Sequence, residues 1–126
     1  METDIRIGTL VNRGMGSPDY IRQILPHGFE SFSLMFWQTA LDIDFAKLAD
    51  ETRGVLDGSD SIISSLGVFG NPMDTEPGDE ETRKSWEVAI DNAHLFGCDI
   101  VSGFTGRLRG VPIHENIDRF KEVWRS

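Results

Sequence analysis

Cysteine is almost missing from this sequence, since Cys98 is the single one in 126 residues. A lone thiol cannot form an internal disulfide, and it has no second thiol with which to build a metal-binding motif. A disulfide scaffold is therefore excluded, and a reducing compartment is expected. We expect Cys98 to serve as a small buried residue.

Basic residues are also scarce, because 12 Lys and Arg stand against 21 Asp and Glu and the net charge is −9. This charge repels a nucleic acid unless a local basic patch outweighs it, so no nucleic-acid partner is expected. The apolar runs, such as residues 32–37, fall far short of the ~20 residues that cross a membrane. Residues 1–4 also lack the basic start of a signal peptide. We expect a cytoplasmic protein without a membrane partner.

The remaining composition is typical of one globular domain. Hydrophobic residues make up 39% of the chain and charged residues 26%, which excludes a disordered or collagen-like chain. On length alone, residues 1–126 are expected to form a single domain.

A pattern of a short apolar segment, a turn and an amphipathic helix occurs four times. Residues 5–11 are partly alternating and β-branched, and glycines follow them at 14 and 16. Ser17, Pro18 and Asp19 then provide the cap, the first-turn proline and the acid that begin a helix. The same pattern predicts four βα units over residues 5–27, 29–58, 62–97 and 99–126.

The third unit contains an acidic segment. Residues 71–78 are too hydrophilic for us to expect them in the core, and they are predicted to form a loop. Asp79, Glu80 and Glu81 follow at the start of a helix, where negative charge is favourable. Together with Glu76 they are expected to be solvated and not to act as a carboxylate pair with a tuned pKa.

Four βα units in a row predict an α/β fold with parallel strands and right-handed crossover helices. Such strands form either an open doubly wound sheet or part of a closed barrel. The chain has no G-x-G-x-x-G that opens directly into a helix and no Walker sequence, which favours the barrel. A complete barrel has eight strands, so we expect half of a (β/α)8 TIM barrel.

Four segments suggest a family by their order and spacing. Residues 66–74, 89–101, 103–107 and 120–124 are similar to the sugar phosphate isomerase/epimerase family. That family belongs to the xylose isomerase-like barrels, alongside the AP endonuclease type 2 proteins. The resemblance extends over essentially the whole chain, but it covers only the first four of the family's eight βα units.

The resemblance implies metal-assisted proton transfer beside the carbonyl of a sugar or sugar phosphate. Family members hold Mn, Mg or Zn at the mouth of the barrel with Glu, Asp and His, chiefly from the second half. None of these ligands can be assigned to this chain. The endonuclease branch also has histidines at the ends of the third and fourth strands. Here those ends are Phe69-Gly70-Asn71 and Phe104-Thr105-Gly106, which argues against DNA repair.

In such barrels the reactive face is built from the carboxyl ends of the strands and the loops that follow. The polar and aromatic residues expected there are Asn12, Arg13, Trp37, Gln38, Asn71, Thr105, Arg107 and Arg109. The residues predicted to contact a sugar substrate are Asn12, Trp37, Gln38, Asn71, Thr105 and Arg107.

Each of these predictions has an alternative. Asn71 offers both donors and an acceptor to a sugar hydroxyl, or it satisfies the backbone of its own loop. Trp37 presents an apolar wall to a sugar ring, or it closes the mouth of the barrel. Arg107 and Arg109 clamp an anion, or they are solvated or paired with nearby acids.

Half a barrel leaves one face of its sheet without a partner. The side chains expected to point inward, toward the missing wall, are Ile7, Phe32, Leu34, Ile63, Ser65 and Val101. The first and fourth strands would also have exposed edges. The chain is therefore expected to be a fragment of a longer protein, to pair with a copy of itself, or to pair with a complementary half-barrel.

Two functional hypotheses remain at this stage. In the first, the chain is half of a sugar isomerase or epimerase and furnishes the walls and loops on the substrate side. In the second, it is a non-catalytic half-barrel that assembles as a binding or structural module.

Overall fold

The computed structural model describes residues 5–125. Four strands alternate with four α-helices, as the repeated pattern predicts. In chain order these are β1 (Gly8–Val11), α1 (Ser17–Ile24), β2 (Ser31–Trp37), α2 (Phe45–Leu56), β3 (Ile62–Phe69), α3 (Pro77–Asn92), β4 (Val101–Gly103) and α4 (Ile117–Trp124). Single 3₁₀ turns flank the helices as η1 (Gly14–Gly16), η2 (Leu25–His27), η3 (Ala93–Phe96) and η4 (Ile113–Asn116).

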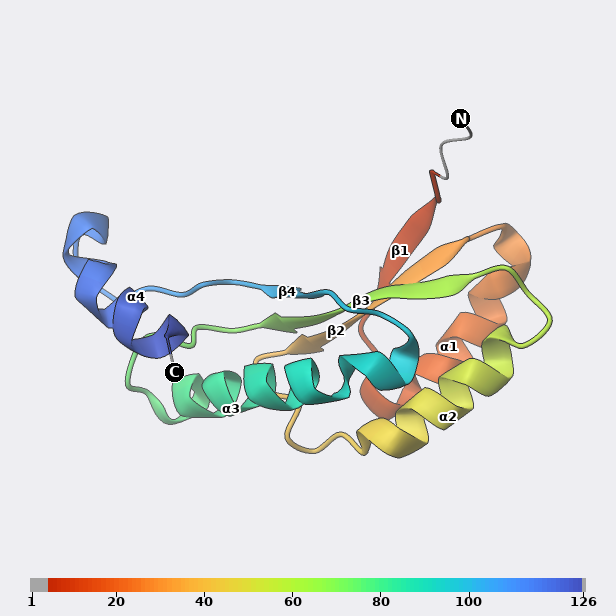
Figure 1. Ribbon diagram of the computed structural model, residues 1–126, viewed down its shortest axis with the longest axis horizontal. Coiled ribbons are helices and arrows are strands. Elements are labelled where there is room, and N and C mark those ends of the chain that lie inside the picture. Colours follow the sequence, from red (N-terminus) through yellow and green to blue (C-terminus); the bar gives the residue numbers. More distant parts are fainter. Residues whose placement is uncertain (1–4, 126) are drawn as a thin grey trace.

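The strands form one parallel sheet in the order β1-β2-β3-β4. A doubly wound sheet reverses its strand order at a switch point, whereas a barrel keeps the order of the chain. Helices α1, α2 and α3 lie on one side of the sheet, and its other face is open (Figure 1). The expected α/β class and the four parallel strands are confirmed, and the order is that of a barrel half.

The hydrophobic core lies between the sheet and the helices. Phe32 and Leu34 from β2 pack there with Leu66 from β3, against Ile21 of α1 and Leu48 of α2. All five side chains are fully buried. The core is therefore complete on this side without any contribution from a second wall.

The prediction that Phe32, Leu34, Ile63 and Val101 point into the barrel is wrong. The first three are buried in the helix-side core, and Val101 packs against it. Side chains of a strand alternate between its two faces, so an error of one residue exchanges the assignments of β2. In β3 a register shift opposite Phe32 and Ser33 interrupts the alternation, which places Ile63 on the helix side and Ser65 on the open side. In a strand as uniformly apolar as β2, the pattern does not show which set faces the helices.

The open face carries the alternate residues of the same strands. Leu10 precedes the buried Val11, and Trp37 follows the buried Phe36; these two side chains are 59% and 61% exposed. In the middle of this face Ser33 and Ser65 share a hydrogen bond of 2.7 Å between their hydroxyls. Ser65 is thus on the predicted side, and Ile7 is exposed ahead of β1.

The expectation that residues 71–78 lie outside the core is wrong for two of them. Pro72 and Met73 are buried, and Gly106 of the loop before α4 lies so close to them that a Cβ there would collide with Pro72. Arg119 in α4 donates from its Nε to the carbonyl of Met73 at 2.7 Å, which holds the helix on this loop.

None of the helices found between residues 5 and 125 has the length and the apolar character that a membrane span requires.

Candidate functional site

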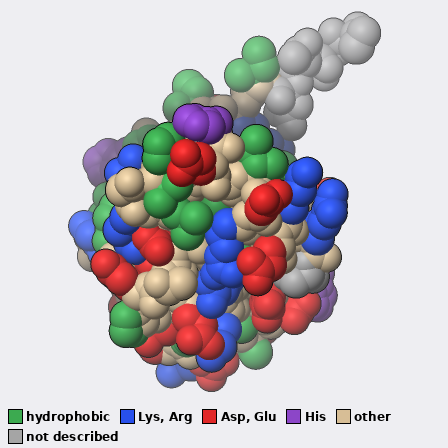
Figure 2. Space-filling model, turned by 90° about the vertical axis from the view of Figure 1, so that its left-hand side faces the viewer, with side chains coloured by type: hydrophobic (Ala, Val, Ile, Leu, Met, Phe, Trp, Pro, Cys, Tyr) green, Lys and Arg blue, Asp and Glu red, His purple; other side chains and the backbone are tan. Residues whose placement is uncertain are grey.

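The carboxyl ends of the strands border a hollow of about 340 Å³. In parallel α/β folds this is the end at which ligands bind and chemistry occurs. Three of the residues predicted to bind substrate line it: Trp37, Gln38 and Asn71. Figure 2 looks at this end of the molecule and shows acidic and basic side chains mixed over its surface.

One wall of the hollow is aromatic. Trp37 ends β2 and pairs in register with Phe69, which ends β3. Phe69 in turn meets Phe104 edge to face, with ring centroids 5.3 Å apart and planes at 81°. Trp37 and Phe104 are both more than half exposed, so the wall is open to a ligand. Phe69 and Phe104 were not among the predicted residues, although their positions at strand ends matched that of Trp37.

Gln38 enters the hollow from a strained backbone position. Its φ is +62°, and it is the one residue other than glycine with a positive φ between residues 5 and 125. The Gln38 amide donates to the Phe69 carbonyl at 3.0 Å, and the Thr82 hydroxyl donates to the Gln38 carbonyl at 2.7 Å. Neighbouring segments thus hold a conformation that costs energy, as is common in binding sites.

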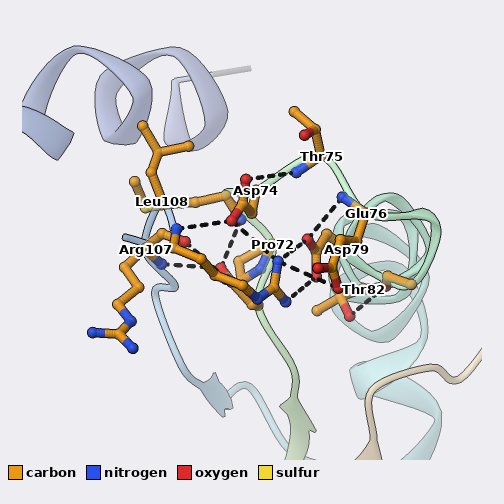
Figure 3. A network of polar contacts seen from close by, with 12 residues as sticks. Pro72, Asp74, Thr75, Glu76, Asp79, Thr82, Arg107 and Leu108 are labelled. Atoms are coloured by element: carbon orange, nitrogen blue, oxygen red, sulfur yellow. Dashed lines mark hydrogen bonds and ion pairs between the residues drawn. The ribbon is translucent and has the colours of Figure 1, made fainter. Parts of the chain in front are cut away.

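Arg109 joins the acidic residues that form the opposite wall of the hollow. It forms a bidentate pair with Asp79, with Nη1 at 2.6 Å from Oδ2 and Nη2 at 2.8 Å from Oδ1. It also binds Asp74 through Nη1 at 3.1 Å and through its backbone amide at 2.8 Å. Glu76 lies 3.6 Å from the same Nη1. This network joins the loop after β4 to the loop after β3 (Figure 3).

The network decides between the alternatives left open for Arg109. The guanidinium of Arg109 is paired with acids and is not directed into the hollow toward a ligand. Asp79 was expected to be solvated, and this prediction is wrong because only 4% of the residue is exposed. The sequence shows an acid in the first turn of a helix, but it does not show the arginine that lies 30 residues later and covers that acid.

Asp79 and Asp74 are held in the ionised form by Arg109. Hydrogen bonds from the Arg109 side chain lower the pKa of Asp79 below its ordinary value of 3.8, against the opposing effect of its burial. The Arg109 backbone amide is the main cause of the lowered pKa of Asp74. Arg109 itself has a raised pKa, chiefly because of its bonds to Asp79. None of these groups is tuned to exchange a proton near neutral pH.

The lowered pKa of Asp79 predicts a loss of stability in acid. A carboxyl group whose pKa is lower in the folded state stabilises the fold fully above its ordinary pKa of 3.8. That contribution disappears as the pH falls through the folded-state pKa. Thermal unfolding followed from about pH 6 to about pH 2 should therefore show a steeper decline for the natural chain than for Asp79→Asn. Parallel curves for the two proteins would contradict the role given to this carboxylate.

Asn71 uses its amide to hold the loop after β4. Its Oδ1 accepts from the backbone amides of Arg107 at 2.9 Å and Met73 at 3.2 Å, and its Nδ2 donates to the Arg107 carbonyl at 2.8 Å. Gly106 has φ +85°, and a Cβ there would collide with the Asn71 side chain. These contacts match the alternative in which Asn71 satisfies the backbone of the loops. One hydrogen of its Nδ2 is left for a ligand.

The other predicted residues lie elsewhere. Arg107 points away from the network (Figure 3) and borders a neighbouring hollow of about 200 Å³ with Thr105 and Phe120. The Thr105 carbonyl accepts from the indole of Trp124 at 3.1 Å. Asn12 is exposed after β1 and lines neither hollow. The structure thus brings together Trp37, Gln38 and Asn71, and it separates Asn12, Thr105 and Arg107 from them.

The metal implied by the resemblance does not fit the residues described here. Between residues 5 and 125, no three His, Cys, Asp or Glu side chains are placed to hold an ion. The acids nearest the strand ends, Asp74 and Asp79, already bind Arg109. No catalytic step through a metal follows from this half of the fold.

Comparison with known proteins gives no further assignment. No protein-family model matches the chain, and no curated protein matches it.

Proposed function

We propose that this chain is the substrate-side half of a barrel of the sugar isomerase/epimerase type and that it binds an uncharged sugar. The main support is the aromatic wall of Trp37, Phe69 and Phe104 at the carboxyl ends of three neighbouring strands. Aromatic rings suit the apolar face of a sugar ring. The Gln38 side chain beside them offers an amide donor and acceptor to its hydroxyls.

The charge of the hollow favours a neutral sugar over a phosphorylated one. Among residues 5–125, Arg109 is the single cation on its lining, and it is bound by Asp79, Asp74 and Glu76. A phosphate would meet an excess of negative charge, and it would have to displace carboxylates to reach the guanidinium. A phosphorylated substrate would therefore need cationic groups from outside this hollow.

In this proposal the chain positions the substrate and does not perform the proton transfer. Asp79 and Asp74 are held ionised by Arg109, so the acid/base groups and metal ligands of the parent reaction belong to other segments. The same observation favours a second candidate for the isolated chain, a module that binds a sugar without converting it. Both candidates require the same binding surface.

Sugar binding can be tested by NMR on the full chain with D-fructose, D-xylose and D-fructose 6-phosphate. We expect the neutral sugars to shift the indole resonance of Trp37 and the side-chain amide of Gln38. Trp37→Ala should weaken their binding about tenfold, which corresponds to ~1.4 kcal/mol. Phe120→Ala removes an exposed aromatic side chain outside this hollow and should leave the affinity unchanged. Tighter binding of the phosphate ester, or shifts confined to residues outside the hollow, would contradict the proposal.

A further inference from the structure

The sheet has one open face and two open edges. Helices cover only the opposite face (Figure 1). Within residues 5–125, β1 pairs only with β2 and β4 pairs only with β3. The exposed apolar side chains at the strand ends of the open face include Leu10, Trp37 and Phe104. Uncovered edges and apolar faces of this kind normally have a partner.

We propose that two copies of this chain close into one eight-stranded barrel, with β4 of each copy paired to β1 of the other. All four strands are parallel and in chain order, so a second β1 placed beside β4 continues the sheet without a change of direction. A two-fold axis along the barrel repeats the same joint on the other side. Both edges of both copies are then paired, which is the closed arrangement that a two-fold dimer permits.

The open face is chemically suited to meet a copy of itself. Strands 8–11, 31–37, 62–69 and 101–103 contain no Asp, Glu, Lys or Arg. The net charge of −9 therefore lies outside the strands, and closure brings no like charges together inside the barrel.

The open face supplies about half of the area that a stable dimer needs. The strands contain 4, 7, 8 and 3 residues, so at about 3.3 Å per residue and about 4.8 Å between strands they cover on the order of 350 Å² in each copy. Two copies therefore cover about 700 Å² of sheet. The paired edges and the neighbouring helices supply the rest of the ~1,200–2,000 Å² buried in specific interfaces. In this arrangement a second copy supplies the missing wall, which corresponds to the second candidate function, a module that binds a sugar without converting it.

The dimer does not depend on sugar binding, but it affects the hollow. Closure places two copies of Trp37 at the same mouth, since all strands of a barrel point to one end. Each hollow is then bounded by residues of both chains. Loss of sugar affinity in a monomeric variant would reveal this contribution, while an unchanged affinity would leave the proposed sugar site intact without the dimer.

Sedimentation equilibrium on the full chain tests the association. We expect about 28 kDa, twice the 14.1 kDa of one chain. Leu10→Asp places a charge on the open face, where it should raise the dissociation constant by about 100-fold or more. Leu10 is 59% exposed in the single chain, so the variant should keep its circular dichroism. Ile90→Asp on α3 is a matched control at 57% exposure and should remain dimeric.

Hydrogen exchange tests which edges pair. Successive residues of a parallel strand turn their backbone groups to alternate sides. The Ile7 carbonyl accepts from Glu30 and the Ile100 carbonyl accepts from Leu66, so the amides of Leu10 and Val101 point away from the sheet. Amides of Leu10 and Val101 should therefore be protected in the natural chain and should exchange quickly in Leu10→Asp. A monomer at about 100 µM, or a dimer whose edge amides exchange freely, would overturn the proposal. Complementation only by a different chain would also overturn it.

Discussion

Phe32→Ala is expected to lower the free energy of unfolding by about 3–5 kcal/mol, because a fully buried aromatic ring is lost from the core. The ring lies between the sheet and helices α1 and α2. Because these helices are packed on the sheet, they cannot easily move into the cavity that the missing ring leaves. Denaturant unfolding followed by circular dichroism measures the change. A loss below ~1 kcal/mol would mean that Phe32 faces the open side after all.

The matched control for this substitution is Phe104→Ala on the open face. The same ring is removed there, but it is 55% exposed, so the monomer should lose much less stability. Both variants should be compared in the Leu10→Asp background, in which the open face is not covered by a second copy. Equal losses in the two variants would contradict the assignment of the faces.

Arg109→Met is the second large expected effect. It leaves the buried Asp79 carboxylate without its bidentate partner and removes the side-chain bond to Asp74, while the backbone amide of residue 109 still donates to Asp74. A buried charge that loses its partner is strongly destabilising, so the melting temperature should fall by several degrees. Hydrogen exchange over residues 105–111 should increase at the same time. Calorimetry and exchange measured on the same preparation would test both effects.

Arg107→Met is the matched control for this prediction. It removes the same side chain two positions away, but the Arg107 guanidinium points away from the network (Figure 3). Its melting temperature and loop exchange should match those of the natural chain. If the two variants behave alike, the Arg109 network does not anchor the loop.

This network explains how a loop can provide a fixed wall for a ligand. The loops after β3 and β4 are joined by Arg109 on one side and by Asn71 on the other. Both contacts link residues about 30 positions or more apart in the chain. A hollow bounded by such cross-linked loops needs little reorganisation on binding, which favours affinity.

The candidate site was partly predictable. Trp37, Gln38 and Asn71 follow apolar strands, and the rule that parallel strands present their carboxyl ends together brought them to one place. The rule could not show that the side-chain amide of Asn71 uses most of its hydrogen bonds to hold the loop of Arg107. It also could not separate Arg107 from Arg109, because both are flanked by glycine in one loop.

The sequence by itself determined the four βα units, the parallel sheet and the strand ends that form the site. These features depend on local periodicity, on caps and on the handedness of crossovers, which act over short stretches of chain. Only the tertiary structure decided that Phe32 faces the helices and that Arg109 covers Asp79. The face of a uniformly apolar strand and the partner of a buried charge depend on segments distant in sequence, which local patterns do not encode.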